Sequence, residues 1–179
     1  MACFGIFGNS GEVCSANSRL LVQREIADDF VAKIVEHAAH YSPGDPLDPA
    51  SAAGPIVSGK QLDQILHYAQ VGAADGTLAL GGNRIGESGY FMEPTVVTDL
   101  SADSAVVTDE IFGPVLAVIP FDSEEEAIAL ANDTPYGLAA SAWTSNLDRA
   151  LRVSEALHAG TVSVNTVDAL SMGTPFGGF

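Results

Sequence analysis

The last third of the chain alternates short apolar runs with amphipathic stretches. Residues 115–121 form an apolar run long enough for a buried strand, and the runs at 139–144 and 161–165 have the same character. Between them, residues 123–132 and 146–158 carry apolar side chains at helical spacing. Apolar strands joined by helices are typical of parallel βαβ units. We therefore expect these three strands to be parallel and connected by the two helices.

The preceding residues show the same two periodicities. Apolar residues repeat every four positions over 25–40, which predicts an amphipathic helix. Ser58 and Gln61 have the spacing of a capping box, and the apolar stripe behind them predicts a second helix. Shorter apolar runs predict strands at 19–23 and 77–80.

Residues 90–97 are extended in character but contain Pro94, which cannot donate a hydrogen bond to a neighbouring strand. We expect this segment to be irregular or to lie at the edge of a sheet. The complete pattern predicts an α/β fold of three layers, in which helices cover both faces of a largely parallel, twisted sheet. Residues 1–179 contain no linker long enough to divide them into two domains.

Composition narrows the class of protein. With 47% hydrophobic residues among 179, the chain can bury the core of one soluble domain. Its formal net charge of −16 repels nucleic acid and anionic membranes, so neither is an expected partner. No apolar run is long enough to span a membrane, and no basic region of a signal peptide precedes the first apolar residues. Two cysteines are too few for a disulfide scaffold, which favours the reduced cytoplasm.

Candidate chemistry centres on Cys14. It lies in a segment rich in small residues, directly before the first expected strand, where a nucleophile can be exposed and held still. A thiol at this place could equally be a small buried hydrophobe, as most free cysteines are. His37 and His40 lie three residues apart, but no third ligand accompanies them, so no metal site is expected.

The wider segment around Cys14 carries a resemblance. Residues 9–19, NSGEVCSANSR, resemble the nucleophile segment of the NAD(P)-dependent aldehyde dehydrogenases. Three later stretches are similar to other signatures of that family, in the same order: DEIFGPV at 109–115, GTVSVN at 160–165 and PFGG at 175–178. Together they cover nearly the whole chain, and the branch acting on aminoaldehydes and other small aldehydes is the most similar. The resemblance implies the catalytic-domain fold of the family.

The resemblance also implies roles for individual residues. The Cys14 thiolate would attack an aldehyde, passing through a thiohemiacetal and a thioacyl intermediate to a carboxylic acid, and its backbone N–H would help to bind the oxyanion. Glu110 would accept hydrogen bonds from the ribose hydroxyls of NAD or NADP, and Phe112 would pack beside the nicotinamide. The remaining expected substrate-pocket residues are Phe7, Val13, Ser15, Asp168, Leu170 and Phe176.

Several family features have no counterpart in these residues. There is no glycine-rich phosphate-binding motif, and the resemblance places the nucleotide-binding domain, the glutamate base and a C-terminal pairing arm outside this sequence. We therefore expect a catalytic-domain fragment that lacks dehydrogenase turnover on its own, from an enzyme that is a homo-oligomer. Two alternatives stay open. A cysteine-dependent esterase or thioesterase would need a histidine near Cys14, and a non-catalytic interaction domain would retain the fold without a reactive thiol.

Overall fold

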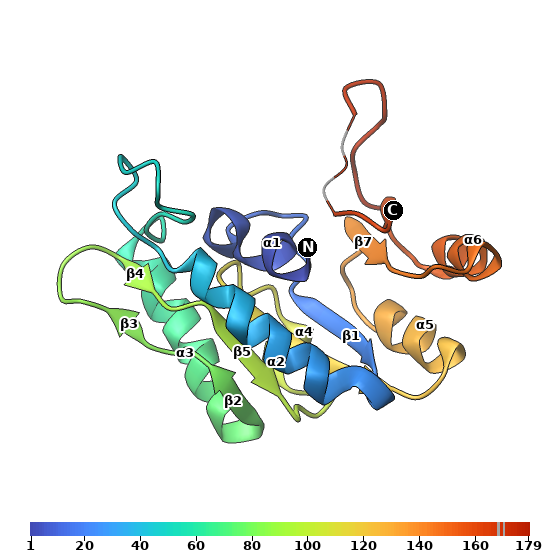
Figure 1. The fold of residues 1–179 in the computed structure, drawn as a ribbon, viewed down its shortest axis with the longest axis horizontal. Helices are drawn as coiled ribbons and strands as arrows, with labels where there is room; N and C mark the ends of the chain where they lie inside the picture. The colour runs from blue at the N-terminus through green and yellow to red at the C-terminus, as the bar shows by residue number, and fades with distance from the viewer. Residues whose placement is uncertain (168, 170) are drawn as a thin grey trace.

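The computed structural model describes residues 1–167, 169 and 171–179. Its main sheet has four strands in the order β1-β6-β5-β2. Figure 1 labels three of them, β1, β5 and β2. β1, β6 and β5 run parallel, with Arg19 beside Ala117 and Thr95 beside Val115, while β2 pairs antiparallel with β5. The bounds of these strands are Arg19–Gln23 for β1, Val115–Phe121 for β6, Thr95–Thr98 for β5 and Thr77–Leu80 for β2.

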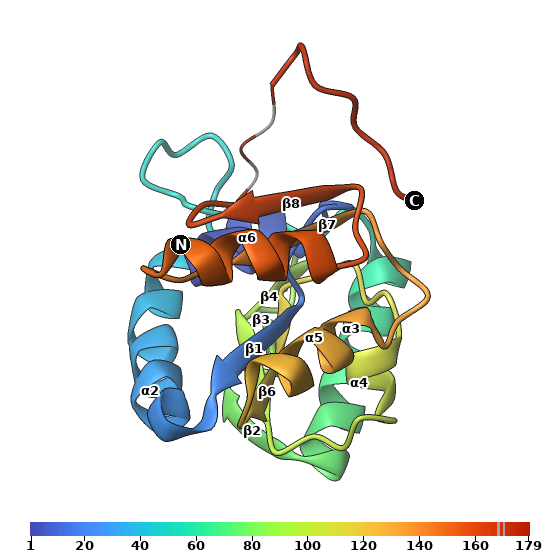
Figure 2. The same cartoon turned by 90° about the vertical axis from the view of Figure 1, so that its right-hand side faces the viewer.

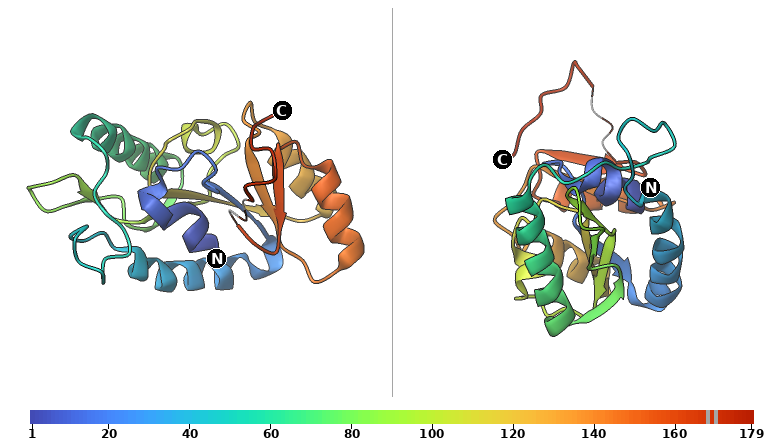
Figure 3. Two further views of the ribbon diagram at one scale, coloured as in Figure 1. Left: turned by 90° about the horizontal axis from the view of Figure 1, so that it is seen from above. Right: turned by 90° about the vertical axis from the view of Figure 1, so that its left-hand side faces the viewer.

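Helices cover both faces of this sheet, which confirms the expected α/β layering. Figure 3 shows α2 and α3 on opposite sides of the strands. Alternate strand residues face the two layers: Val96, Leu116 and Val118 pack in one core cluster, and Val97, Val115 and Ala117 in the other. The first cluster includes residues of α1 and α2, and the second includes residues of α3 and α4. The helix bounds are Ala2–Phe7 for α1, Ala27–Ala38 for α2, Gly59–Asp75 for α3 and Ala105–Thr108 for α4.

The last two strands do not join the main sheet. β7 (Ala139–Ala142) and β8 (Thr161–Val164) pair parallel with each other in a separate two-stranded sheet (Figure 2). The helix between them, α6 (Leu147–Ala156), makes this a βαβ unit as expected, whereas α5 (Glu124–Asn132) follows β6. The expectation that 115–121 belongs to the same parallel unit was wrong. β6 is already hydrogen-bonded on both sides, to β1 and β5, so it has no free edge for β7.

The expectation for 90–97 was also wrong in part. A small hairpin pairs β3 (Arg84–Ile85) with β4 (Phe91–Met92), but β5 lies inside the main sheet and its first residue, Thr95, is fully buried. Pro94 is compatible with this place because it comes before the strand. The first ladder donor is the Thr95 amide, which donates to the Pro114 carbonyl at 2.9 Å. Within the part of the chain that the structure describes, no helix is long and apolar enough to cross a membrane.

Candidate functional site

Cys14 lies on a tight turn five residues before the first residue of β1, as expected. The Ala16 amide donates to the Val13 carbonyl at 3.0 Å and closes a turn around the cysteine, whose side chain is exposed. The Cys14 backbone N–H donates to no group among the described residues. Ser15, one residue further along, is buried. The turn thus presents the Cys14 thiol outward while its neighbour faces the protein.

The second cysteine has the opposite environment. Cys3 is on α1, 6% exposed, with its sulfur 3.7 Å from the Ile34 carbonyl oxygen. Burial raises the pKa of the Cys3 thiol, because the thiolate would lose its hydration. The two thiols therefore differ in their access to solvent.

The segment before Cys14 is fastened to other parts of the chain. The Ser10 hydroxyl donates to the Gly54 carbonyl at 2.9 Å, and the Glu12 carboxylate accepts from the Val57 amide at 3.2 Å. Partial burial raises the pKa of Glu12, and the hydrogen bond from Val57 opposes that shift. These bonds join the Cys14 segment to the loop that precedes α3, so the loop restrains the residues before Cys14.

The same segment also contacts the stretch at 109–115. Gly11 has a φ of +70°, and a side chain there would overlap the backbone of Gly113. This contact places the residue before Glu12 next to the residue after Phe112. The two stretches that resemble family signatures are therefore neighbours in space.

Glu110 and Phe112 lie on the turn between α4 and β6. The Glu110 side chain is exposed, and its backbone amide donates to the Tyr136 hydroxyl at 3.2 Å. Phe112 has a φ of +56°, which is uncommon for an aromatic residue, and its side chain is 38% exposed. Gln61, on α3, donates from its side-chain amide to the carbonyls of Ile111 and Phe112 at 3.0 and 2.9 Å. The turn is held firmly while its charged and aromatic side chains face outward.

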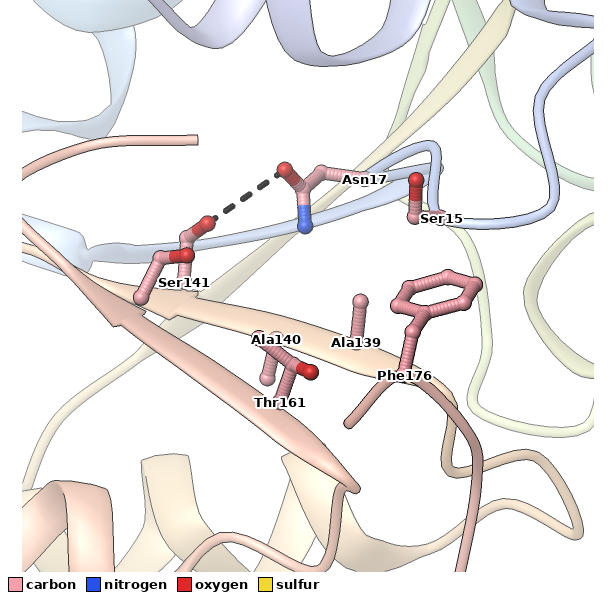
Figure 4. A pocket seen from close by; sticks show the side chains of 8 residues that line it. Ser15, Asn17, Ala139, Ala140, Ser141, Thr161 and Phe176 are labelled. Carbon is pink, nitrogen blue, oxygen red and sulfur yellow. Dashed lines mark hydrogen bonds between the residues drawn. The ribbon is translucent and has the colours of Figure 1, made fainter. Parts of the chain in front are cut away.

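The expected substrate-pocket residues are only partly brought together. Ser15 and Phe176 line one small hollow with residues of β7 and β8, and Ser141 donates a hydrogen bond to Asn17 there at 3.4 Å (Figure 4). Its volume of about 10 Å³ has room for a single water molecule, which is too little for an aldehyde. Val13 is half-buried beside Cys14. Of the expected pocket residues, Ser15 and Phe176 are thus the two that the structure brings together.

Phe7 lies elsewhere. It is 1% exposed and packs in the core between α1 and the sheet, with its ring centroid 6.1 Å from that of Tyr41. A side chain so buried cannot touch a substrate in this conformation, so its expected pocket role has no support in the geometry. Asp168 and Leu170 fall outside the described residues.

The histidine-dependent alternative finds no support in the geometry. None of the four histidines, all of which are described, is hydrogen-bonded to the Cys14 sulfur. His37 and His40 have ring centroids 6.0 Å apart on the outside of α2 and its continuation. No group of three or more metal-ligating side chains occurs among the described residues.

Sequence reasoning missed three residues around the candidate site. Asn17 and Ser141 belong to segments distant in the sequence, and no local signal pairs them. Gln61 was noticed in the sequence, because its spacing from Ser58 is that of a capping box. That spacing predicted a helix cap and not a contact with the turn at 110–112.

Comparison with known proteins adds independent evidence. The model of the aldehyde dehydrogenase family matches residues 1–179. An aldehyde dehydrogenase of Emericella nidulans is 48% identical over 179 residues, which cover 99% of this chain and 36% of that protein. The structure of the gamma-glutamyl-gamma-aminobutyraldehyde dehydrogenase of Burkholderia cenocepacia is 50% identical with a TM-score of 0.97, and the match covers 99% of this chain and 36% of that one.

A third match is to an aldehyde dehydrogenase of Bacillus cereus, solved as a complex with NAD⁺. It is 43% identical, with a TM-score of 0.96, over 99% of this chain and 36% of that one. The chain therefore spans about 36% of the length of the relatives it matches.

Proposed function

The chain belongs to the aldehyde dehydrogenase family, and from this premise we propose that residues 1–179 form the catalytic domain of an NAD(P)-dependent aldehyde dehydrogenase. The observation that carries the proposal is the exposed Cys14 thiol on a turn fastened to the loop before α3. Because the matched relatives are about three times longer, the activity of the whole protein is part of this proposal and not a finding.

Cys14 performs the covalent step in this account. Its thiolate attacks the aldehyde carbon, and the carbonyl electrons move to the oxygen, giving a thiohemiacetal. The Cys14 backbone N–H, which has no partner among the described residues, donates to that oxyanion. Loss of hydride from the former aldehyde carbon leaves a thioester on Cys14. Water then adds to the thioester, and the departing thiolate releases a carboxylic acid.

The turn at 110–112 fits one end of the cofactor. Glu110 offers an exposed carboxylate, whose two oxygens suit the two neighbouring hydroxyls of a ribose. Phe112 offers a partly exposed ring two residues further on, suited to the flat nicotinamide. When bound, NAD or NADP supplies the acceptor for the hydride. The described residues offer nothing that distinguishes the two cofactors.

The substrate is a small aldehyde in this proposal. Val13, Ser15, Phe176, Asp168 and Leu170 are its pocket residues by resemblance, and the hollow lined by Ser15 and Phe176 supports two of them. An acid at 168 would favour a cationic aminoaldehyde through charge attraction. The strongly acidic surface makes nucleic acid and anionic membranes poor partners, and the whole enzyme is proposed to be a cytoplasmic homo-oligomer.

A chimeric enzyme tests this function. The present chain replaces the matching region of the Burkholderia cenocepacia relative, which is 50% identical to it. We expect the purified chimera to form NADH from NAD⁺ with propanal or an aminoaldehyde, and the variant carrying Cys14→Ala to lose that activity. The matched control is Cys3→Ala, which should keep it. A chimera that melts cooperatively but forms no NADH, or one whose activity survives Cys14→Ala, would contradict the proposal.

A further inference from the structure

Gln61 occupies a position where a glutamine commonly closes a capping box. Ser58 is the N-cap of α3, and its hydroxyl accepts from the Gln61 amide at 3.2 Å, which is half of that motif. In the other half, the Gln61 side chain would turn back to the Ser58 backbone amide. Instead, its Nε2 donates to two carbonyl oxygens of another segment, those of Ile111 and Phe112. The Gln61 side chain therefore binds the turn before β6 and not its own helix terminus.

Two successive carbonyls can point at one nitrogen only if the chain bends sharply between them. Phe112 provides that bend with a φ of +56°, a conformation that is strained for an aromatic residue and persists only where its surroundings hold it. The Gln61 amide supplies two hydrogen atoms at this point, one for each carbonyl. Without them, the extended conformation that aromatic residues prefer becomes competitive at Phe112.

Other side chains hold the start of the turn but not its bend. The Tyr68 hydroxyl donates to the Asp109 carboxylate at 2.9 Å, and the Tyr136 hydroxyl accepts from the Glu110 amide at 3.2 Å. Ile111 is buried in the core, which anchors the middle of the turn. Among the described residues, Gln61 is the side chain that bonds the carbonyl of Phe112.

We propose that Gln61 is a positioning residue that holds Phe112 in the left-handed conformation and so presents Glu110 and Phe112 together to the nicotinamide end of the cofactor. This rests on the proposed function. Gln61 acts here through two backbone carbonyls, and its own contact with the cofactor is not needed for the effect. The consequence is that a side chain on α3 controls the geometry of a ligand-binding turn fifty residues away in the sequence.

Backbone NMR of the chain tests the proposal with three variants. Gln61→Met keeps the length of the side chain but cannot donate, Gln61→Lys restores a donor, and Gln70→Met is the matched control at an exposed position of the same helix. We expect the ¹⁵N order parameters at 110–113 to fall from about 0.85 to below about 0.6 in Gln61→Met only. We also expect the strong amide-to-Hα Overhauser effect of a left-handed Phe112 to weaken in that variant and to return in Gln61→Lys.

The proposal is overturned if Gln61→Met, with an unchanged fold by circular dichroism, leaves the order parameters and the Phe112 signal as in the parent chain. It is also overturned if Gln61→Lys fails to restore them. Titration with nicotinamide mononucleotide adds a second measurement, the chemical-shift changes of the amides at 110–113. We expect Gln61→Met to need at least tenfold more ligand than the parent chain for the same changes. Equal affinity would contradict the positioning role. If the parent chain shows no such shifts, the proposed cofactor role of Glu110 and Phe112 fails, while the order parameters still decide what Gln61 does.

Discussion

Gly11 and Gly113 pack backbone against backbone, so that a Cβ built on Gly11 would overlap the carbonyl group of Gly113. One of these glycines lies three residues before the candidate nucleophile, and the other directly follows Phe112. Their contact joins the segment before Cys14 to the proposed cofactor turn. Any side chain at position 11 must push the two apart.

Gly11→Ala should therefore destabilise the chain and disturb the site. The added Cβ meets backbone that cannot rotate away, and the φ of +70° is unfavourable for alanine. Overpacking and left-handed strain together predict a loss of roughly 2–5 kcal/mol in the free energy of unfolding, measured by urea denaturation.

Gly8→Ala is the matched control for Gly11→Ala. Gly8 has an ordinary φ of −55°, and a Cβ there would lie 3.7 Å from the Phe4 ring, which is a normal contact. We expect its effect to stay within about 1 kcal/mol. Equal losses from the two substitutions would show that the contact between Gly11 and Gly113 has no special role.

Glu12 should give a pH-dependent contribution to stability. Burial raises its pKa above the ordinary value of 4.5, so the folded state holds this proton more tightly than the unfolded state does. The contribution of Glu12 is then most favourable at low pH and is lost as the pH rises through its folded pKa. In Glu12→Gln that loss disappears, because the amide does not ionise.

Urea unfolding of the parent chain and of Glu12→Gln, between about pH 4 and pH 7, measures this effect. The stability of the parent relative to the variant should fall as the pH rises. A difference that stays constant, or grows in favour of the parent, would mean that the hydrogen bond from Val57 outweighs burial.

The exposed face of α6 should promote self-association. Leu147 and Leu151 are 73% and 55% exposed and lie one helical turn apart. The net charge of −16 opposes association at low ionic strength, and salt screens that repulsion. Light scattering should show a larger average mass at high salt, which the double variant Leu147→Ser, Leu151→Ser reduces. A strictly monomeric particle at both salt concentrations would refute this.

The 179 residues on their own should form no NADH from aldehyde and NAD⁺ at a useful rate. They contain no glycine-rich phosphate motif, and the family resemblance places the general base outside them. A general base alone contributes roughly 10² to 10⁴ in rate. The assay uses the purified chain with propanal. Sustained turnover that vanishes in Cys14→Ala would show that these residues already form a complete enzyme.

Much of the fold followed from local pattern. The capping residue Ser58 and the apolar stripe behind it placed α3, and the apolar run at 115–121 placed β6. Strand partners depend on contacts between residues distant in the sequence. Local periodicity therefore could not show that β6 pairs with β1 and β5, or that β7 and β8 pair only with each other. The same limit applies to Pro94, which marks the start of an interior strand and not an edge.

The candidate site also has features that the sequence predicted and features that it did not. Small turn residues before an apolar run were enough to place Cys14 on a connection before a strand. Whether its thiol is exposed or buried stayed open until the structure showed it to be exposed. The resemblance implied that Phe7 belongs to the pocket, but its side chain on α1 is buried in the core. For Gln61 the sequence suggested no role in the site, because the turn at 110–112 that it contacts lies fifty residues away in the chain.

The central claim is that Cys14 is the nucleophile, and acylation by p-nitrophenyl acetate tests it most directly. The folded chain is treated with limiting ester, and the acetylated cysteine is identified by peptide mapping and mass spectrometry. The exposed Cys14 should carry nearly all of the label, since Cys3 is buried and its pKa is raised. Cys3→Ala should leave the acylation rate unchanged, and Cys14→Ala should abolish it. Acetylation mainly at Cys3, or an unchanged rate in Cys14→Ala, would contradict the account.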